Sequence, residues 1–203
     1  IKQAAAYALA RIQNRGVVDE LLKYKSDTDP VVRHEIAHAL AYTEHSDAEA
    51  TLLEFLSDRD NRVKQRAVKA ARERGMKSAF NKIKNLVEAR HSGIRLEVIQ
   101  AVIALADPED KSMFDIYASR LYDREADIRL FAVQALKSFA LDPRTTSVVG
   151  GVVIDKDVRV KVAALEVLSA SGDANAIEQV VRGLFDTSKG AKSVKLAALD
   201  ALQ

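Results

Sequence analysis

A nine-residue segment that recurs at nearly constant spacing constrains this chain more than any other feature. The segment VRHEIAHAL, residues 32–40, has six relatives, which begin at residues 1, 63, 94, 128, 160 and 194. The starts of successive copies lie 31, 31, 31, 34, 32 and 34 residues apart. Self-similarity at such a period indicates a repeat protein whose units stack on one another.

The apolar columns of the segment predict an α-helix. When the first residue of each copy is position zero, positions zero, four, five, seven and eight are apolar in all seven copies. This spacing is one stripe of a helix and does not fit the alternation of a strand. Position seven is small, which lets neighbouring helices approach closely: Ala8, Ala39, Ala70, Ala101, Ala135, Val167 and Ala201.

A second helix is predicted between successive copies, so each unit is a helical hairpin. Its expected N-caps are Asp47, Asp107, Asp142 and Asp173, and Gly16, Gly75 and Gly172 are expected to end the helix before it. One such helix, in residues 143–155, carries adjacent glycines at 150 and 151. These glycines indicate either a hinge or a close contact with a neighbouring unit.

Position one is basic in every copy, and acids precede it in register. The basic residues are Lys2, Arg33, Lys64, Arg95, Arg129, Lys161 and Lys195; the acids include Asp27, Asp29, Asp58, Asp60, Asp123, Glu125, Asp155 and Asp157. The acids suit helix N-termini. The basic column is either a ladder for phosphates or a set of ion pairs between repeats, and the register of the acids favours ion pairs.

Runs of the form D-x-x-V-R-x-x-x-A-x-x-A-L, such as the one that starts at Asp29, resemble the short bacterial form of the HEAT-repeat family. This form is also seen in phycobilin lyases and deoxyhypusine hydroxylase. The resemblance covers the whole chain and implies an all-α fold, a right-handed α-α superhelix of about 6.5 helical hairpins, with the second helices on the concave face. We expect residues 1–203 to be one repeat array and, because the repeats run to both ends, a piece of a longer protein.

The letters His34-Glu35-Ile36-Ala37-His38 spell H-E-x-x-H, which on a helix suits a zinc peptidase. A catalytic zinc needs a third protein ligand, and no candidate stands out. Val32–Glu35 also matches one of the His-Glu pairs by which deoxyhypusine hydroxylase holds two irons. The equivalent places in the other copies lack such a pair, so we expect no metal and no other cofactor, with His34, Glu35 and His38 as the weak candidates.

Positive charge gathers in the middle of the chain. Residues 59–95 hold twelve Lys or Arg and three acids, although the whole chain has a net charge of only +2. Arg66, Lys69 and Arg72 lie on the side of their helix that faces away from the apolar stripe. This basic cluster suits an acidic protein segment or, as the alternative, nucleic acid.

Position two changes from polar to apolar along the chain. It is occupied by Gln3, His34 and Gln65 and then by Leu96, Leu130, Val162 and Leu196, and Phe131 adds an aromatic side chain beside it. These residues form either an apolar binding stripe or part of the packing between units.

Taken with composition, these features predict a binding protein. The chain is 48% apolar and has no Cys and no long apolar run, so disorder, disulfides and a membrane span are excluded. We expect a cytoplasmic, non-catalytic scaffold that binds a partner protein or peptide on its concave face through Arg66, Lys69, Arg72 and the apolar stripe. The alternatives are a nucleic-acid-binding solenoid through residues 59–95 and a metal-dependent enzyme through residues 34–38.

Overall fold

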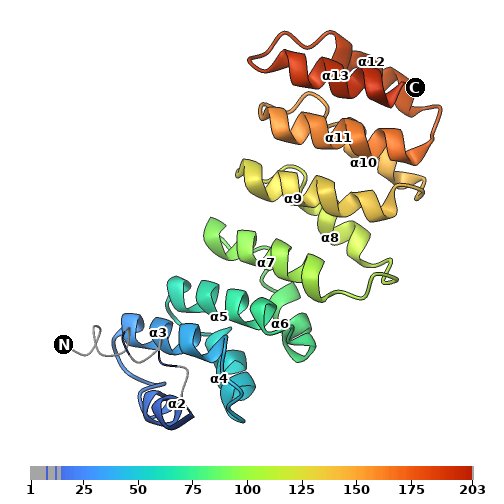
Figure 1. The fold of residues 1–203 in the computed structure, drawn as a ribbon. Helices are drawn as coiled ribbons and strands as arrows, with labels where there is room; N and C mark the ends of the chain where they lie inside the picture. The colour runs from blue at the N-terminus through green and yellow to red at the C-terminus, as the bar shows by residue number, and fades with distance from the viewer. Residues whose placement is uncertain (1–7, 9–11, 13–14, 203) are drawn as a thin grey trace. The chain divides into compact units, whose positions relative to one another are not determined.

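We describe residues 8, 12 and 15–202 of the computed structural model. The chain divides into two compact units, an N-terminal unit, Ile1–Ala106, and a C-terminal unit, Asp107–Gln203. The described residues form helices and no strand, and the described part of each unit contains three helical hairpins (Figure 1). The all-α fold class is therefore as predicted.

The hairpins of the N-terminal unit pair α2 (Arg15–Leu22) with α3 (Pro30–Leu40), α4 (Ala48–Phe55) with α5 (Asn61–Glu73), and α6 (Phe80–Lys84) with α7 (Ser92–Leu105). A 3₁₀ turn, η1 (Lys77–Ala79), leads into the short α6. The second helices α3, α5 and α7 pack on one another in sequence order. Their apolar stripes bury Ile36, Val68 and Ile99 completely.

The hairpins of the C-terminal unit repeat this plan. They pair α8 (Met113–Arg120) with α9 (Ala126–Leu136), α10 (Arg144–Gly150) with α11 (Val158–Ser171), and α12 (Ala176–Leu184) with α13 (Ala191–Ala201). The 3₁₀ turn η2 (Lys137–Phe139) follows α9. In this unit α9, α11 and α13 pack side by side, and Ile128, Val160 and Val194 are fully buried.

The repeat columns predict six second helices correctly. Each of these helices begins two or three residues before position zero of its copy, and the copy at residues 1–9 lies largely outside the described residues. Position seven is buried at Ala39, Ala70, Ala101 and Val167, as a close helix contact requires. It is only half-buried at Ala135 and Ala201.

The expected helix ends are confirmed in part. Gly75 and Gly172 adopt φ of 68° and 60° where α5 and α11 end, a conformation that glycine takes without steric cost. The expectation for Gly16 is wrong, because this residue lies inside the first turn of α2. Asp107 does not cap α8 either, because its carboxylate accepts a bond from the amide of Glu109, before the helix begins at Met113.

The glycines of α10 allow close contacts. A Cβ on Gly151 would collide with the hydroxyl of Tyr122, and one on Gly150 would lie 3.0 Å from Cγ of Gln179. Both neighbours belong to adjacent hairpins of the same unit. These contacts favour the close-approach interpretation of the two glycines.

Candidate functional site

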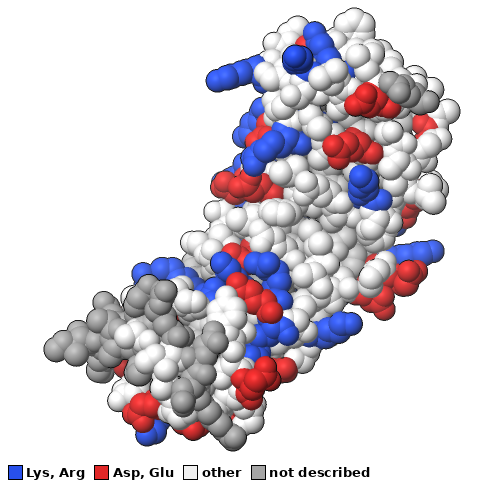
Figure 2. Space-filling model, viewed as in Figure 1, with Lys and Arg blue, Asp and Glu red and all other residues white. Residues whose placement is uncertain are grey.

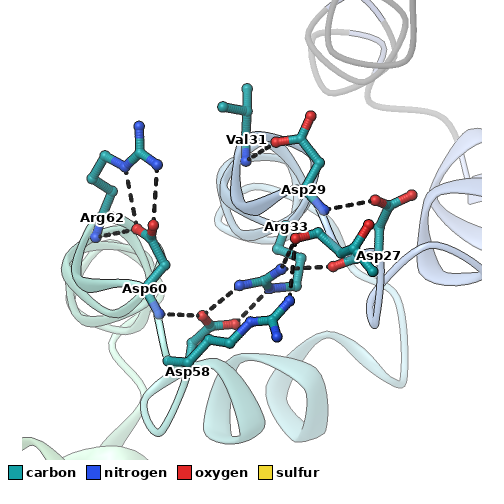
Figure 3. A network of polar contacts seen from close by, with 9 residues as sticks. Asp27, Asp29, Val31, Arg33, Asp58, Asp60 and Arg62 are labelled. Atoms are coloured by element: carbon teal, nitrogen blue, oxygen red, sulfur yellow. Dashed lines mark hydrogen bonds and ion pairs between the residues drawn. The ribbon is translucent and has the colours of Figure 1, made fainter.

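Arg33 shows what the basic column does in the N-terminal unit (Figure 3). Its Nε and Nη2 donate to the two carboxylate oxygens of Asp58 in the next hairpin, at 2.7 and 2.8 Å. Its Nη1 donates to the backbone carbonyl of Asp27 at 2.6 Å. The side chains of Arg33 and Asp58 are 5% and 8% exposed, so this is a buried, fork-like ion pair.

The same contact recurs in the C-terminal unit. Arg129 donates to both oxygens of Asp155 at 2.7 Å and to the carbonyl of Asp123. Lys161 binds Asp186 at 2.6 Å and the hydroxyl of Ser188. The structure therefore favours ion pairs between repeats over a phosphate ladder at Arg33, Arg129 and Lys161.

The acids of the turns cap the second helices and bind basic side chains. Asp29, Asp60 and Asp157 accept a bond from the amide two residues ahead and cap the second helices α3, α5 and α11. Arg62 holds the pKa of Asp60 at about 2, mainly through a side-chain hydrogen bond. Burial raises the pKa of Asp58, but hydrogen bonds from Arg33 and the amide of Asp60 outweigh that effect, so its pKa is lowered.

The H-E-x-x-H residues form a compact cluster on α3. Nδ1 of His34 lies 3.0 Å from one oxygen of Glu35, and Nδ1 of His38 lies 3.7 Å from the other. Burial and the nearby Arg66 guanidinium lower the pKa of His38. Residues 8, 12 and 15–202 contain no group of three or more His, Asp or Glu side chains that could hold a metal ion. The absence of a bound metal stays a prediction.

The basic cluster on α5 is more mixed than the sequence indicates. Arg66 lies 3.4 Å from Glu73 of the same helix, and Arg72 lies 3.3 Å from Glu97 on α7. Figure 2 shows acidic and basic side chains next to each other over this part of the N-terminal unit. Lys69 is half-buried. The second-helix face of this unit therefore offers paired charges, with an Nε of Arg66 and of Arg72 buried without a partner among the described residues.

Several other cations between residues 59 and 95 serve the fold. Their side chains donate to backbone carbonyls of neighbouring turns or pair with a nearby acid: Arg59, Arg62, Arg74, Lys82 and Arg95. Arg74, for example, donates to the carbonyls of Leu40 and Thr43 at the end of α3. The excess of positive charge in this region is thus largely part of the framework.

The predicted apolar stripe is divided between the two units. Leu96 is half-buried on α7, so it belongs to the N-terminal unit, whose second-helix face carries the mixed charges. Leu130, Phe131 and Val162, on α9 and α11, are also half-buried, and Leu196 on α13 is 51% exposed. None of the five is among the fully packed residues of the described chain.

The second-helix face of the C-terminal unit contains a hollow. It has a volume of about 330 Å³ and lies between η2, α11 and α13. Its lining combines small side chains with charges at its edges: Lys137, Glu166, Ser169, Ala170, Ala197, Asp200 and Ala201. The sequence alone gives no sign of it, because small residues at helix contacts are also part of the packing pattern. Such a hollow can take an apolar side chain flanked by polar groups.

Helical hairpins stacked through buried ion pairs define a class of repeat protein, and the comparisons with known proteins agree. Residues 1–54 match the family model of HEAT repeats. No curated protein matches the chain.

Solved structures extend the likeness to nearly the whole chain. YibA of Escherichia coli has a TM-score of 0.71 at 15% identity, covering 97% of this chain and 85% of that one. An engineered protein has a TM-score of 0.61 at 19% identity, with 91% and 96% covered. The complex of CpcE and CpcF of phycocyanin lyase from Nostoc has a TM-score of 0.58 at 20% identity, with 98% and 80% covered. The fold is therefore a HEAT-like repeat fold, one that commonly mediates protein interactions.

No helix within residues 8, 12 and 15–202 is long and apolar enough to cross a bilayer. A fold of this kind can support either binding or catalysis, so the function has to be argued from the surface residues.

Proposed function

We propose that this chain is a non-catalytic scaffold that binds a partner protein or peptide on the second-helix face of its repeats. The observation that carries the proposal is the incomplete burial of the apolar residues on α9, α11 and α13. In a helical repeat, an apolar column that neighbouring helices do not cover is available to a partner.

The hollow supports the same face. It lies between α11 and α13, the helices that also carry Val162 and Leu196, and its alanines leave room for a partner side chain. Lys137, Glu166 and Asp200 at its edges give a partner polar groups of both signs. Apolar contacts would supply most of the affinity, and these charges would set register and approach rate.

The phycocyanin lyase structure is a complex of two HEAT-like chains, which supports a protein as the partner here. The paired cations of residues 59–95 support nucleic acid less well, because phosphate binding needs exposed, unpaired charge. The contacts of Glu35 with both histidines do not build the open, three-ligand site that a catalytic zinc needs.

Affinity capture with matched variants tests the proposal. We would immobilise the wild-type chain, Leu196→Asp, Leu130→Asp and the control Leu141→Asp, whose side chain is 85% exposed and lies outside this face. A protein held by the wild type and by Leu141→Asp, lost with both other variants and resistant to nuclease, is the expected result. Leu196→Asp carries the most weight, because its exposed side chain contributes little to folding.

Three results would contradict the proposal. Capture that all four chains share equally would remove the second-helix face as the binding surface. Capture that nuclease or moderate salt abolishes would point to nucleic acid through the basic cluster. One equivalent of metal in chelator-free protein, lost on His38→Ala, would revive the enzyme alternative.

A further inference from the structure

The turns between first and second helices of the C-terminal unit carry three large apolar side chains that the fold leaves uncovered. Tyr122 is 69% exposed, Ile154 is 72% exposed and Phe185 is 76% exposed. They lie in the α8–α9, α10–α11 and α12–α13 turns, which share one edge of this unit in Figure 1. We call these three residues the apolar turn ladder.

The buried ion pairs hold these turns against one another. Asp155, the neighbour of Ile154, binds Arg129 at the start of α9, just after the turn that carries Tyr122. Asp186, the neighbour of Phe185, binds Lys161 near the start of α11, just after the turn that carries Ile154.

Two glycines add contacts between the same turns. The hydroxyl of Tyr122 reaches Gly151 in the next turn, and Gly190 lies against Val158 at the start of α11. These contacts therefore hold the backbone of the turns that carry the apolar turn ladder in place.

Exposure of one large apolar residue needs no explanation, but one in the first-to-second-helix turn of each of three successive hairpins makes a surface patch. In the N-terminal unit only Tyr24, which is 45% exposed in the α2–α3 turn, is a large exposed apolar residue of such a turn among the described residues. The column of Tyr122 and Ile154, six residues before position zero of the repeat, is occupied there by Ser26, Ser57 and Glu88. All three are polar and exposed.

The charges around the ladder favour an acidic partner. Most acids of the three turns are already paired: Asp155 with Arg129, Asp186 with Lys161, and Asp157 with Arg159. Asp123 lies 3.7 Å from Arg120. The remaining exposed charges of these turns are Arg124, Lys156, Lys189 and the acid Glu125. Positive charge beside apolar groups thus predominates along the edge.

The spacing of the repeats selects a backbone conformation for the partner. Packed helices lie about 8–10 Å apart, and the turns between them follow that spacing. A polyproline II segment has three residues per turn and rises about 3.1 Å per residue, so every third side chain points the same way after about 9 Å. A β-strand presents alternate residues instead and does not match the ladder.

We propose that the apolar turn ladder binds an extended, acidic segment of a partner protein that carries a large apolar residue at every third position. Tyr122, Ile154 and Phe185 contact these apolar residues in turn. Arg124, Lys156 and Lys189 lie near the acids between them. This surface is separate from the second-helix face of the proposed function. A lipid surface fits less well, because it would also meet the carboxylates of Glu125 and Asp157.

The probe is a fluorescein-labelled peptide, Leu-Pro-Glu repeated five times, with binding to the full chain followed by fluorescence anisotropy. We expect saturable binding by the wild type. The triple variant Tyr122→Ser, Ile154→Ser, Phe185→Ser should bind at least about tenfold more weakly. The same peptide with Lys in place of Glu should also bind at least about tenfold more weakly at low salt.

Matched controls separate the ladder from general stickiness. Leu141→Ser removes an equally exposed apolar side chain outside the ladder and should leave binding unchanged. Thermal unfolding followed by circular dichroism should be the same for all variants, because the altered side chains are exposed.

Three outcomes would overturn the proposal. They are absence of peptide binding to the wild type, equal binding by wild type and triple variant, or preferential binding of the Lys peptide. Sedimentation with phosphatidylserine vesicles is the companion measurement. If the wild type binds the vesicles, the triple variant does not, and the peptide fails to bind, the ladder is a membrane surface.

Discussion

In the N-terminal unit Arg33 binds both oxygens of Asp58, and in the C-terminal unit Arg129 binds both oxygens of Asp155 at nearly the same distances. The surfaces on this shared framework differ. On the second-helix face, charged pairs such as Arg72 with Glu97 occupy the N-terminal unit, whereas Phe131 and its apolar neighbours occupy the C-terminal unit.

The turns show a similar difference: the column of Tyr122 and Ile154 holds serine or glutamate in the N-terminal unit, where Tyr24 is the large apolar residue exposed in a described turn. Some columns of the repeat are therefore reserved for stacking, and the remaining columns are free to vary. The two units present different surfaces, although the contacts that hold their hairpins together are alike.

Removal of one partner of the shared ion pair has the largest expected effect. Arg33→Met and Arg129→Met each leave a buried carboxylate without its cation, which should cost about 3–5 kcal/mol of unfolding free energy. Urea unfolding measures the loss, and hydrogen exchange shows which unit opens. The double variants Arg33→Met, Asp58→Leu and Arg129→Met, Asp155→Leu should recover much of it. A loss in only one unit would show that the two frameworks are not equivalent.

Small-residue packing should separate the units by a smaller amount. Ala70 is fully buried, so Ala70→Leu should overpack the contacts of α5 and cost about 1–3 kcal/mol. Ala135 occupies the same column on α9 but is half-buried, so Ala135→Leu should cost less. Equal melting temperatures for Ala70→Leu and the parent chain would show that position seven is not a close helix contact.

Acid should weaken the C-terminal unit through Asp186. Hydrogen bonds from Lys161 and Ser188 lower the pKa of this carboxyl to about 2 in the folded chain. Because the folded pKa lies below the ordinary value of about 4, the pair stabilises the fold above pH 4, and this contribution is lost as pH falls toward 2. Unfolding free energies between pH 5 and 2 should be less steep for Asp186→Asn. The exposed Glu109→Gln is the control, and an unchanged slope for Asp186→Asn would contradict the assignment.

The glycines of the C-terminal unit give the smallest effects. Gly151→Ala meets only the movable end of Tyr122, so its stability should stay within about 0.5 kcal/mol of the parent chain. Gly183→Ala is the matched contrast, because its Cβ would meet Ala198 and Leu165 at 3.1 and 3.2 Å in a buried contact. Thermal unfolding of the two variants measures the difference. A large loss for Gly151→Ala would show that Tyr122 cannot move away and that the contact at Gly151 is tight.

The helices that stack were predictable because their columns repeat. Val32, Val63 and Ile94 begin copies of one pattern, and the structure has a helix at each. Gly16 was assigned wrongly because the residues around it have no equally clear column. Local sequence there does not separate the end of one helix from the start of the next.

The site was less predictable because it depends on which side chains meet. Arg72 reaches Glu97 on another helix, and only the rotation of α5 against α7 decides that contact. The apolar turn ladder had a signal, because Tyr122 and Ile154 occupy one column. Phe185 is shifted from this column by three residues in a longer turn, so sequence alignment alone does not join it to the others.

The Arg33–Asp58 contact has a consequence for how the array comes apart. The hairpins of Arg33, Arg129 and Lys161 each hold a buried cation whose counter-ion belongs to the next hairpin. Any one of these hairpins alone would leave that charge exposed or unpaired. In a linear array of nearest-neighbour units, the interfaces between paired hairpins then contribute more to the free energy of unfolding, and the individual hairpins contribute less. Unzipping therefore becomes cooperative within a run of paired hairpins. It should start where a junction lacks the pair and stop where the next pair begins.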